Sequence, residues 1–380
     1  MYILTRQVVW EVLKLFLAAL LGLTLVLTLT VGMREALNAG APASVALYAL
    51  PFMLPGVLGI TIPVSMLFSV CSVFGRMTGA NEIVALKSLG INPMAVIWPA
   101  ILLAAFLSLG TVRMYEIAAT QCKPAFERIL AESIEEIVYS VLQKNHSIDR
   151  DQFSITVKSV DKRTLIRPTI TINNGPSKLT ISAAEAELHW DWKQHCLRFI
   201  YRDGVVDLDE GKGRYTTPGE SEYDLRIEMP KPPPYHRDYV ALGNVPALVA
   251  ELQTTKRQLE HLRDANRALG VPESQEDIDR FNELNRQIYR LRAEPCRRWA
   301  NGFACLGFAL IGIPVAMLWR HADVLTNFFV CFLPILALYY PLLMLSDNLI
   351  TSGRPPICFW TANVALVIPA LALLRWIIRH

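Results

Sequence analysis

Six apolar runs, each long enough to cross a bilayer as a helix, constrain the fold of this chain more than any other feature. The runs cover about residues 9–31, 48–75, 94–118, 298–319, 324–345 and 357–378. A helix needs about 20 apolar residues to cross roughly 30 Å of hydrocarbon, and lipid offers no partner to open backbone groups. We therefore expect an α-helical membrane protein with six transmembrane helices, three within residues 1–118 and three within 297–380. The second run contains Pro51, Pro55 and Pro63 and is expected to be kinked or tilted.

The segment between the two groups, residues 119–296, has the charge density of a soluble domain. Although 52% of the chain is hydrophobic and only 19% is charged, the charged residues concentrate in this segment. Such uneven apolar content is typical of a membrane protein with a water-exposed insertion. The net charge of +3 gives no indication of a nucleic-acid partner.

Lysine and arginine in the short loops predict the orientation, because these residues are enriched on the cytoplasmic side. One set of loops and chain ends carries most of them, namely Arg6, Lys14, Arg76, Lys87, Arg320, Arg375 and Arg379. The opposite loops contribute Arg34 and Arg354. Both termini are therefore expected in the cytoplasm of a bacterium with two membranes, with residues 119–296 in the periplasm.

Residues 119–235 are expected to form a β domain. Between about 152 and 229 lie the segments FSITVKSV, TLIRPTITI, KLTISAAEAELHW and CLRFIYRDGVVDL, which are rich in β-branched and aromatic residues. Turn-forming residues separate these segments, and the proline cluster PKPPPY at 230–235 ends the region. Several short strands in a row predict an antiparallel sandwich or a jelly-roll-like sheet.

Residues 236–296 are expected to form a helical hairpin. The stretch from 246 to 294 is charged and contains one break, at GVPES. Apolar residues recur at helical spacing on both sides of the break, and the second helix can run into the fourth span. The pattern leaves open whether the hairpin is a spacer or a coiled coil that docks a partner.

Motifs of enzyme chemistry are absent from the sequence. It contains no glycine-rich phosphate loop, no GxSxG or HExxH motif, and no clustered histidine and cysteine ligands. Glutamates and aspartates of the apolar regions fall at predicted helix ends, whereas ion-coupled transporters carry ionisable residues in mid-span. We therefore expect no catalytic residues, metal or cofactor, and any transport must draw its energy from another subunit. Cys122 and Cys296, at the two ends of the insertion, can form a disulfide if they lie close together.

The loop RMTGANEIVALKSLGINPMAV, between the second and third runs, contains the most informative motif. Residues 79–91 can form a short helix that starts near Gly79 or Asn81 and stops at Gly90. Asn92 and Pro93 then start the next helix as cap and first turn. An ABC permease offers such a short helix to its ATPase, while a simple connecting turn is the alternative.

Four stretches resemble the lipopolysaccharide-export permeases of the LptF/LptG type, the YjgP/YjgQ family. They are YILTRQVVWEVLKLFLAALLGLTLVLTL, NEIVALKSLGI, GFACLGFALIGIPVAM and GRPPICFWTAN, and they occur in the family's order. The strand segment also fits that family's periplasmic jelly-roll-like domain. In the second stretch, the residues at the spacing of the family's coupling helix are Glu82, Ala85, Leu86, Lys87 and Gly90.

The resemblance implies a mechanism. Two permeases, identical or homologous, would enclose a cavity that admits lipopolysaccharide from the outer leaflet of the inner membrane. A cytoplasmic ABC ATPase dimer would then drive this lipid cargo into the β domains and on to a periplasmic bridge protein. Arg34 and Arg113, near the outer ends of their helices, can bind anionic head groups there, or can extend to the nearest interface instead. The resemblance implies that the β domain holds acyl chains in an apolar groove. Its inward-facing residues, which either line that groove or form an ordinary core, are expected to be Phe153, Ile155, Val157, Ile170, Ile172, Leu179, Ile181, Leu197 and Phe199.

Two other classes fit parts of the pattern. Mechanotransmission ABC proteins of the MacB or FtsX type have four spans with the large domain after the first, which the three-plus-three arrangement disfavours. A membrane-anchored scaffold that binds a periplasmic partner would not need a coupling helix. The sequence leaves open whether the chain is F-like or G-like and whether it pairs with itself.

Overall fold

The computed structural model describes residues 2–39, 43–149, 153–161, 163–174, 177–191, 196–208, 213–225, 240–268, 275–319 and 324–379. The chain divides into two compact units. The first comprises residues 1–28, 52–124 and 235–380, and the second comprises residues 29–51 and 125–234.

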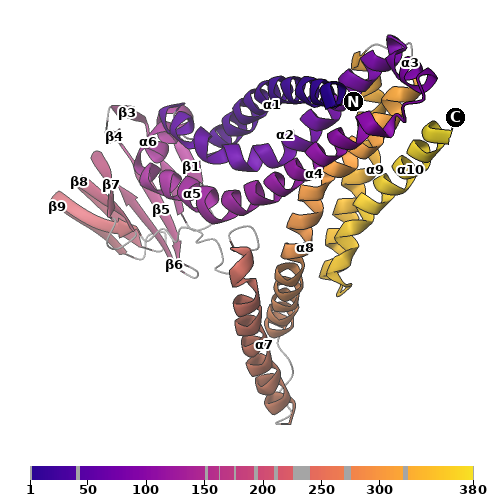
Figure 1. The fold of residues 1–380 in the computed structure, drawn as a ribbon. Coiled ribbons are helices and arrows are strands. Elements are labelled where there is room, and N and C mark those ends of the chain that lie inside the picture. The colour runs from indigo at the N-terminus through magenta and orange to yellow at the C-terminus, as the bar shows by residue number, and fades with distance from the viewer. Residues whose placement is uncertain are drawn as a thin grey trace. The chain divides into compact units, whose positions relative to one another are not determined.

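The first unit is built on six helices that are long and apolar enough to cross a membrane. They are α1 (Tyr2–Ala39), α2 (Ala43–Gly79), α4 (Met94–Ile117), α8 (Gln275–Leu318), α9 (Val324–Thr351) and α10 (Trp360–Arg379). Figure 1 shows both chain ends at the same end of this bundle, as an even number of spans requires. The predicted six-helix architecture, three spans on either side of an insertion, is confirmed.

α2 is the central helix of the bundle. In its apolar window 78% of the residues are buried, compared with 17% in α1 and in α9. α2 continues as one helix through its three prolines. Pro63 has no N–H to offer the carbonyl of Gly59, so that oxygen needs another donor inside the membrane. The Tyr115 hydroxyl, from α4, donates to it at 3.1 Å.

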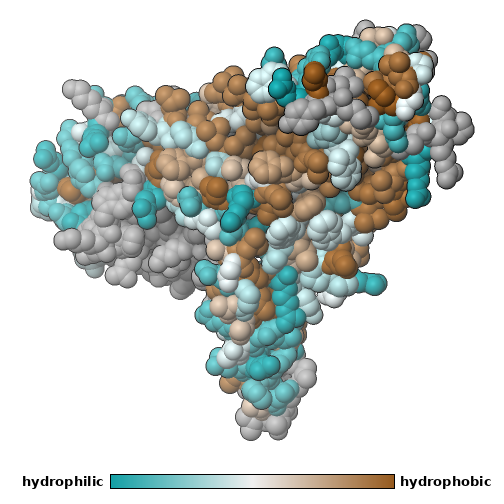
Figure 2. Space-filling view, in the orientation of Figure 1, coloured by the Kyte–Doolittle hydropathy of each residue, from teal (hydrophilic) through white to brown (hydrophobic). Residues whose placement is uncertain are grey.

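α8 is both a span and one arm of the helical hairpin. It runs unbroken for 44 residues. Its first half packs against α7 (Val245–Ala268), and the seam between them buries Val249, Leu252, Ile288 and Leu291. Figure 2 shows hydrophilic residues over this hairpin and hydrophobic ones over the spans. The expectation that the second arm runs into the fourth span is confirmed.

The second unit contains an antiparallel sheet of nine strands. The strands are β1 (Ser147–Asp149), β2 (Phe153–Thr156), β3 (Ser159–Asp161), β4 (Thr164–Ile166), β5 (Thr169–Asn174), β6 (Ser177–Ser182), β7 (Glu185–Asp191), β8 (Cys196–Leu208) and β9 (Gly213–Leu225). Their order is β1-β2-β5-β6-β8-β7-β4-β3, and β9 pairs with β8. The jelly-roll-like prediction is confirmed by this half-barrel.

One face of the sheet holds the core of the second unit. The register aligns Ile155 with Ile170, and Ile170 with Ile181, so their side chains lie in a row on one face. Leu188 and Phe199 continue this face across β7 and β8. Of the nine residues expected to face inward, six are buried, namely Ile155, Val157, Ile170, Ile172, Ile181 and Phe199. Phe153 and Leu179 pack against them, and the side chain of Leu197 lies outside the described residues.

Two parts of the second unit differ from the sequence-based expectation. Helices α5 (Lys123–Glu132) and α6 (Ile134–Asn145) precede the sheet, where only a β domain was expected. Three of the expected β segments each contain two strands, and one of them divides at Arg167, whose φ is 50°. Cys122 and Cys296 are both free thiols, so the disulfide considered from the sequence is not formed.

Candidate functional site

A short helix, α3 (Glu82–Ser88), lies between the second and third spans, at the same end of the bundle as both chain termini (Figure 1). The turn that starts it uses Asn81 in the left-handed conformation, with φ of 58°, which asparagine tolerates better than most residues. The side chain of Asn81 makes no capping hydrogen bond, although its carbonyl accepts the N–H of Ala85 at 3.0 Å. Asn81 therefore starts the helix through its backbone.

The helix stops at Gly90. Gly90 has a φ of 76°, which favours glycine over other residues. Its N–H donates to the carbonyl of Lys87, and the N–H of Ile91 donates to that of Leu86, both at 3.0 Å. This pair of bonds is a Schellman motif, which satisfies the last carbonyls of a helix. Asn92 then accepts the N–H of Met94 at 2.9 Å through its side chain, as expected of a cap for α4.

The inner side of α3 is anchored to the bundle. Ile83 is buried in the span core, and Leu86 packs against the same core. The Lys87 ammonium donates to the carbonyl of Ile377 at 2.9 Å, in the last turn of α10. In the last turn of α2, Arg76 forms an ion pair with Glu11 of α1. α3 is therefore bonded to the last span, and the end of α2 that leads into it is paired with the first span.

The outer side of α3 is exposed. Of the five residues expected to couple to an ATPase, Glu82, Ala85 and Gly90 lie on this side, while Leu86 and Lys87 face inward. Two apolar residues that sequence reasoning did not select are also exposed, Val84 at 41% and Leu89 at 74%. Both are apolar residues of the loop between the second and third spans, which also contains the buried Ile83. The face they form with Ala85, here called the α3 outer face, offers a partner an apolar contact.

A family model described as the lipopolysaccharide export system permease LptF/LptG matches residues 6–376. The chain belongs to the LptF/LptG family. No curated protein matched the chain in sequence. As an LptF/LptG permease, the chain is a transport component of the lipopolysaccharide export system rather than a catalytic subunit, and a multi-pass protein of the inner membrane.

The two arginines expected to bind lipid head groups belong to different units of this LptF/LptG permease. Arg34 lies towards the end of α1 and is exposed. Arg113 lies on α4, one turn before its end, and is also exposed. Both side chains are open to a ligand from outside their own unit.

A buried ionic network joins α4, α8 and the segment that leads into α7. Arg298 is only 3% exposed, and it donates to Glu116 at 2.6 Å and to Glu294 at 2.8 Å. It also donates to the carbonyl of Val240 at 2.9 Å. Arg297 adds two bonds to Glu294, and the N–H of Leu242 donates to Glu116. Sequence reasoning placed Glu116 at a helix end but had no signal that residues 182 positions apart would pair.

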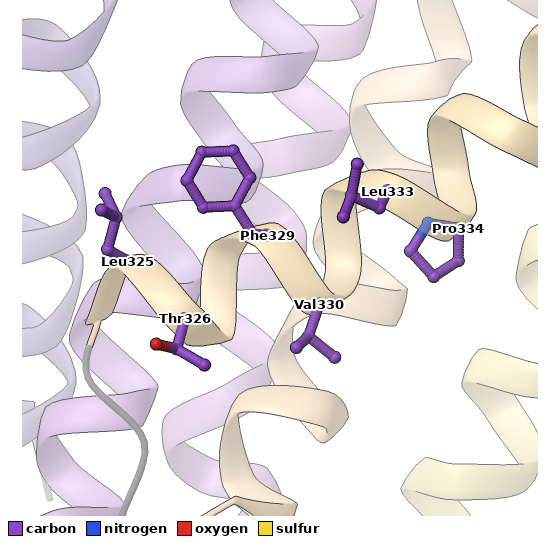
Figure 3. A pocket seen from close by; sticks show the side chains of 6 residues that line it. All are labelled: Leu325, Thr326, Phe329, Val330, Leu333 and Pro334. Atoms are coloured by element: carbon purple, nitrogen blue, oxygen red, sulfur yellow. The ribbon is translucent and has the colours of Figure 1, made fainter.

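α9 carries a shallow apolar groove of about 460 Å³ on its own surface. Figure 3 shows two rows of side chains along the helix, each spaced by four residues. One row is Leu325, Phe329 and Leu333, and the other is Thr326, Val330 and Pro334. Because α9 is also among the least buried spans, the groove faces either lipid or another protein.

Proposed function

We propose that the chain is a permease subunit of an ATP-driven exporter that extracts lipopolysaccharide from the inner membrane and passes it to a periplasmic bridge protein. The observation that carries this proposal is the α3 outer face, on a helix whose inner side is bonded to the bundle. A surface connector has no need of Lys87 bonded to α10 or Ile83 in the core. A helix that transmits force from a partner to the bundle needs one side bonded to the bundle and one side exposed to the partner.

ATP hydrolysis takes place in a separate cytoplasmic ATPase dimer that docks on the α3 outer face. Movement of that dimer displaces α3 and, through the Lys87 and Arg76 bonds, both α10 and α1. Leu89 is the strongest candidate for the buried centre of the contact, because it is apolar and 74% exposed. Glu82 sets the charge at the edge of the same contact.

Tryptophans support the proposed limits of the spans, because this residue is enriched at both membrane interfaces. Trp10, Trp98, Trp319 and Trp376 are all exposed and lie near the helix ends on the side of α3. Trp299 lies twenty residues before Trp319, a separation of about 30 Å along a helix and about the thickness of the hydrocarbon core. With the positive loops in the cytoplasm, α3 is cytoplasmic and the sheet is periplasmic.

A second permease subunit, homologous or identical, completes the path of the lipid. It covers the exposed sides of α1 and α9, including the groove of Figure 3, and the cavity lies between the two subunits. Arg34 and Arg113 each bind anionic lipid head groups at the outer leaflet.

The sheet passes the acyl chains onward. Its apolar face is the route, and β9 is the docking strand for the bridge protein. Within the part of the chain that the structure describes, β9 pairs only with β8, so its other edge is open to an added strand. Adding a strand there extends the half-barrel from one protein into the next.

Co-purification with cytoplasmic ATPases, followed by lipopolysaccharide release from proteoliposomes, tests the proposal. The wild type should retain an ATPase and release lipid only with ATP. Leu89→Asp and Glu82→Lys should lose the ATPase, whereas Leu262→Asp, at a residue of α7 that is 61% exposed, should keep it. The exporter assignment fails if the wild type retains no ATPase.

Orientation has a separate test. A cysteine at Thr216, exposed on β9, should react with an impermeant maleimide from the periplasm. A cysteine at Leu89 should react only when the cytoplasmic side is opened. The reverse pattern would overturn the orientation.

A further inference from the structure

α6 lies across the opening of the sheet in the second unit. It packs against β1, β3 and β7. β1 and β3 are the two ends of the strand order, so one helix contacts both margins of the half-barrel. The consecutive strands β2 and β3 lie near opposite margins, with only Val157 and Lys158 between them.

The inner side of α6 fills the apolar face of the sheet. Leu142 is fully buried and Tyr139 is 8% exposed, and both belong to the same core as the sheet residues. Ile155, Leu165 and Phe199 in that core are also fully buried. While α6 is seated, its own side chains therefore occupy the place that an acyl chain would need.

The polar bonds that hold α6 come mainly from two side chains. The Tyr139 hydroxyl accepts the N–H of Leu188 at 2.8 Å and donates to the carbonyl of Arg163 at 2.6 Å. Glu135 lies 3.7 Å from the Arg163 guanidinium and 3.8 Å from His189. The strands, by contrast, are joined by continuous backbone ladders. α6 is therefore the element of this core that can leave at the lowest cost in hydrogen bonds.

The ends of α6 permit such a movement. The helix has only 12 residues, a length that is marginal without tertiary contacts. Ser133, outside helical geometry, separates it from α5, and His146, in the left-handed conformation, separates it from β1. α6 can therefore move as one piece between two bends of the backbone.

We propose that α6 is a strap that closes the apolar interior of the sheet, with Tyr139 as its latch, and that acyl chains enter by displacing it. This inference rests on the proposed passage of lipid through the sheet. It adds that the interior is closed at rest, and that lipid competes with Tyr139 and Leu142 for the same apolar surface.

Thiol labelling tests the opening of the strap without any export. In the full chain with Cys122, Cys196, Cys296 and Cys358 changed to serine, Leu142→Cys should react slowly with a maleimide. Adding Tyr139→Phe should raise the labelling rate roughly three- to tenfold, because the hydrogen bonds of the Tyr139 hydroxyl are lost. Lipopolysaccharide micelles should raise it as well. Glu136→Cys, on the exposed side of α6, should react equally in all cases.

Equal labelling of Leu142→Cys with and without Tyr139→Phe and lipopolysaccharide would overturn the strap. Because cysteine at a buried leucine can itself loosen the packing, amide exchange at Leu188 in the otherwise native chain gives an independent measurement. Leu188 should be protected in the wild type and exchange faster in Tyr139→Phe.

Cross-linking tests the role of the strap in export. Glu135→Cys and His189→Cys, joined by a short reversible thiol reagent, should stop lipopolysaccharide release from the complete exporter while ATP hydrolysis continues. Reduction should restore release. Undiminished release from the cross-linked exporter would overturn the inference. If the uncross-linked exporter releases no lipid at all, the proposed function fails instead, and the labelling result still decides whether α6 opens.

Discussion

A Cβ atom placed on Gly302 would lie 2.2 Å from Cγ2 of Val112 and 3.1 Å from the backbone nitrogen of the same residue. The backbone carbonyl of Ser108 would be 3.3 Å away. α8 and α4 thus approach until the Val112 side chain fills the place of a side chain at 302. Small residues permit such close approach between membrane helices, and here glycine is required.

Gly302→Ala should destabilise the protein by about 1–3 kcal/mol, because the added methyl group meets backbone as well as the Val112 side chain. Thermal unfolding in detergent measures this change. Val112→Ala should restore only part of the loss. Gly110→Ala is the matched control, because in the part of the chain that the structure describes no neighbouring element comes within 4 Å of the added atom. It should be neutral or slightly stabilising.

Arg298→Met should cost about 3–5 kcal/mol, because it breaks a buried network and removes a partner from Glu294, which is 1% exposed. Urea unfolding in detergent measures the cost. Arg286→Met, which breaks an exposed pair with Glu283, should change stability by at most about 1 kcal/mol. Equal effects of the two substitutions would show that the network contributes nothing.

Lys87→Met should leave the ATPase bound but reduce the lipid released per ATP hydrolysed. The substitution keeps the length of the side chain and removes the donor to Ile377, so α3 can move without carrying α10 with it. Parallel assays of ATP hydrolysis and lipid release separate this outcome from a loss of docking. A loss of ATPase binding would place Lys87 in the contact itself.

Substitutions of Gly90 should weaken the coupling of ATP hydrolysis to lipid release, least for asparagine, more for alanine and most for valine. The left-handed conformation costs roughly 1–2 kcal/mol for most residues, and asparagine tolerates it best. Apart from its chain neighbours, no atom of the described residues lies within 4 Å of an added Cβ at this position, so backbone strain sets the order. ATP-driven lipid release by the three variants tests this ranking, and equal activity of Gly90→Val would contradict it.

Tyr139 should make the second unit sensitive to alkaline pH. Burial raises the pKa of its hydroxyl above the ordinary tyrosine value. The folded state therefore favours the neutral form. This contribution is fully present below the unfolded pKa of about 10 and is lost as pH rises through the folded pKa. The free energy of unfolding should fall more steeply above about pH 10 in the wild type than in Tyr139→Phe, and parallel slopes would contradict this.

The spans and the loop that contains α3 could be predicted because their signals are local. About twenty consecutive apolar residues predict a membrane helix. Gly90 predicts the end of α3, and Asn92, two residues later, predicts the start of α4. The outer face of α3 was only partly foreseen. Lys87 matches the family spacing, yet its direction depends on Ile377, which lies 290 residues away.

The parts that were missed depend on distant partners or on weak local preferences. β9 contains Pro218, Gly219 and several acidic residues, so it lacks the composition of a strand, and its pairing with β8 overrides that preference. α6 was not expected because a β domain was assigned to its whole region. The bonds of Arg298 likewise join segments that sequence spacing alone cannot place together.

The unbroken course of α8 has a mechanical consequence. About 24 of its residues precede Trp299, and they form a lever arm of about 36 Å. Pro295 lacks an N–H and would weaken the helix at the base of the arm. The side-chain bonds of Glu294 to Arg297 and Arg298 connect the residues on either side of Pro295 and reinforce the helix there. A tilt of roughly 10° within the bilayer would then swing the far tip through roughly 6 Å. The hairpin can thus magnify a small rotation of the fourth span into a large stroke.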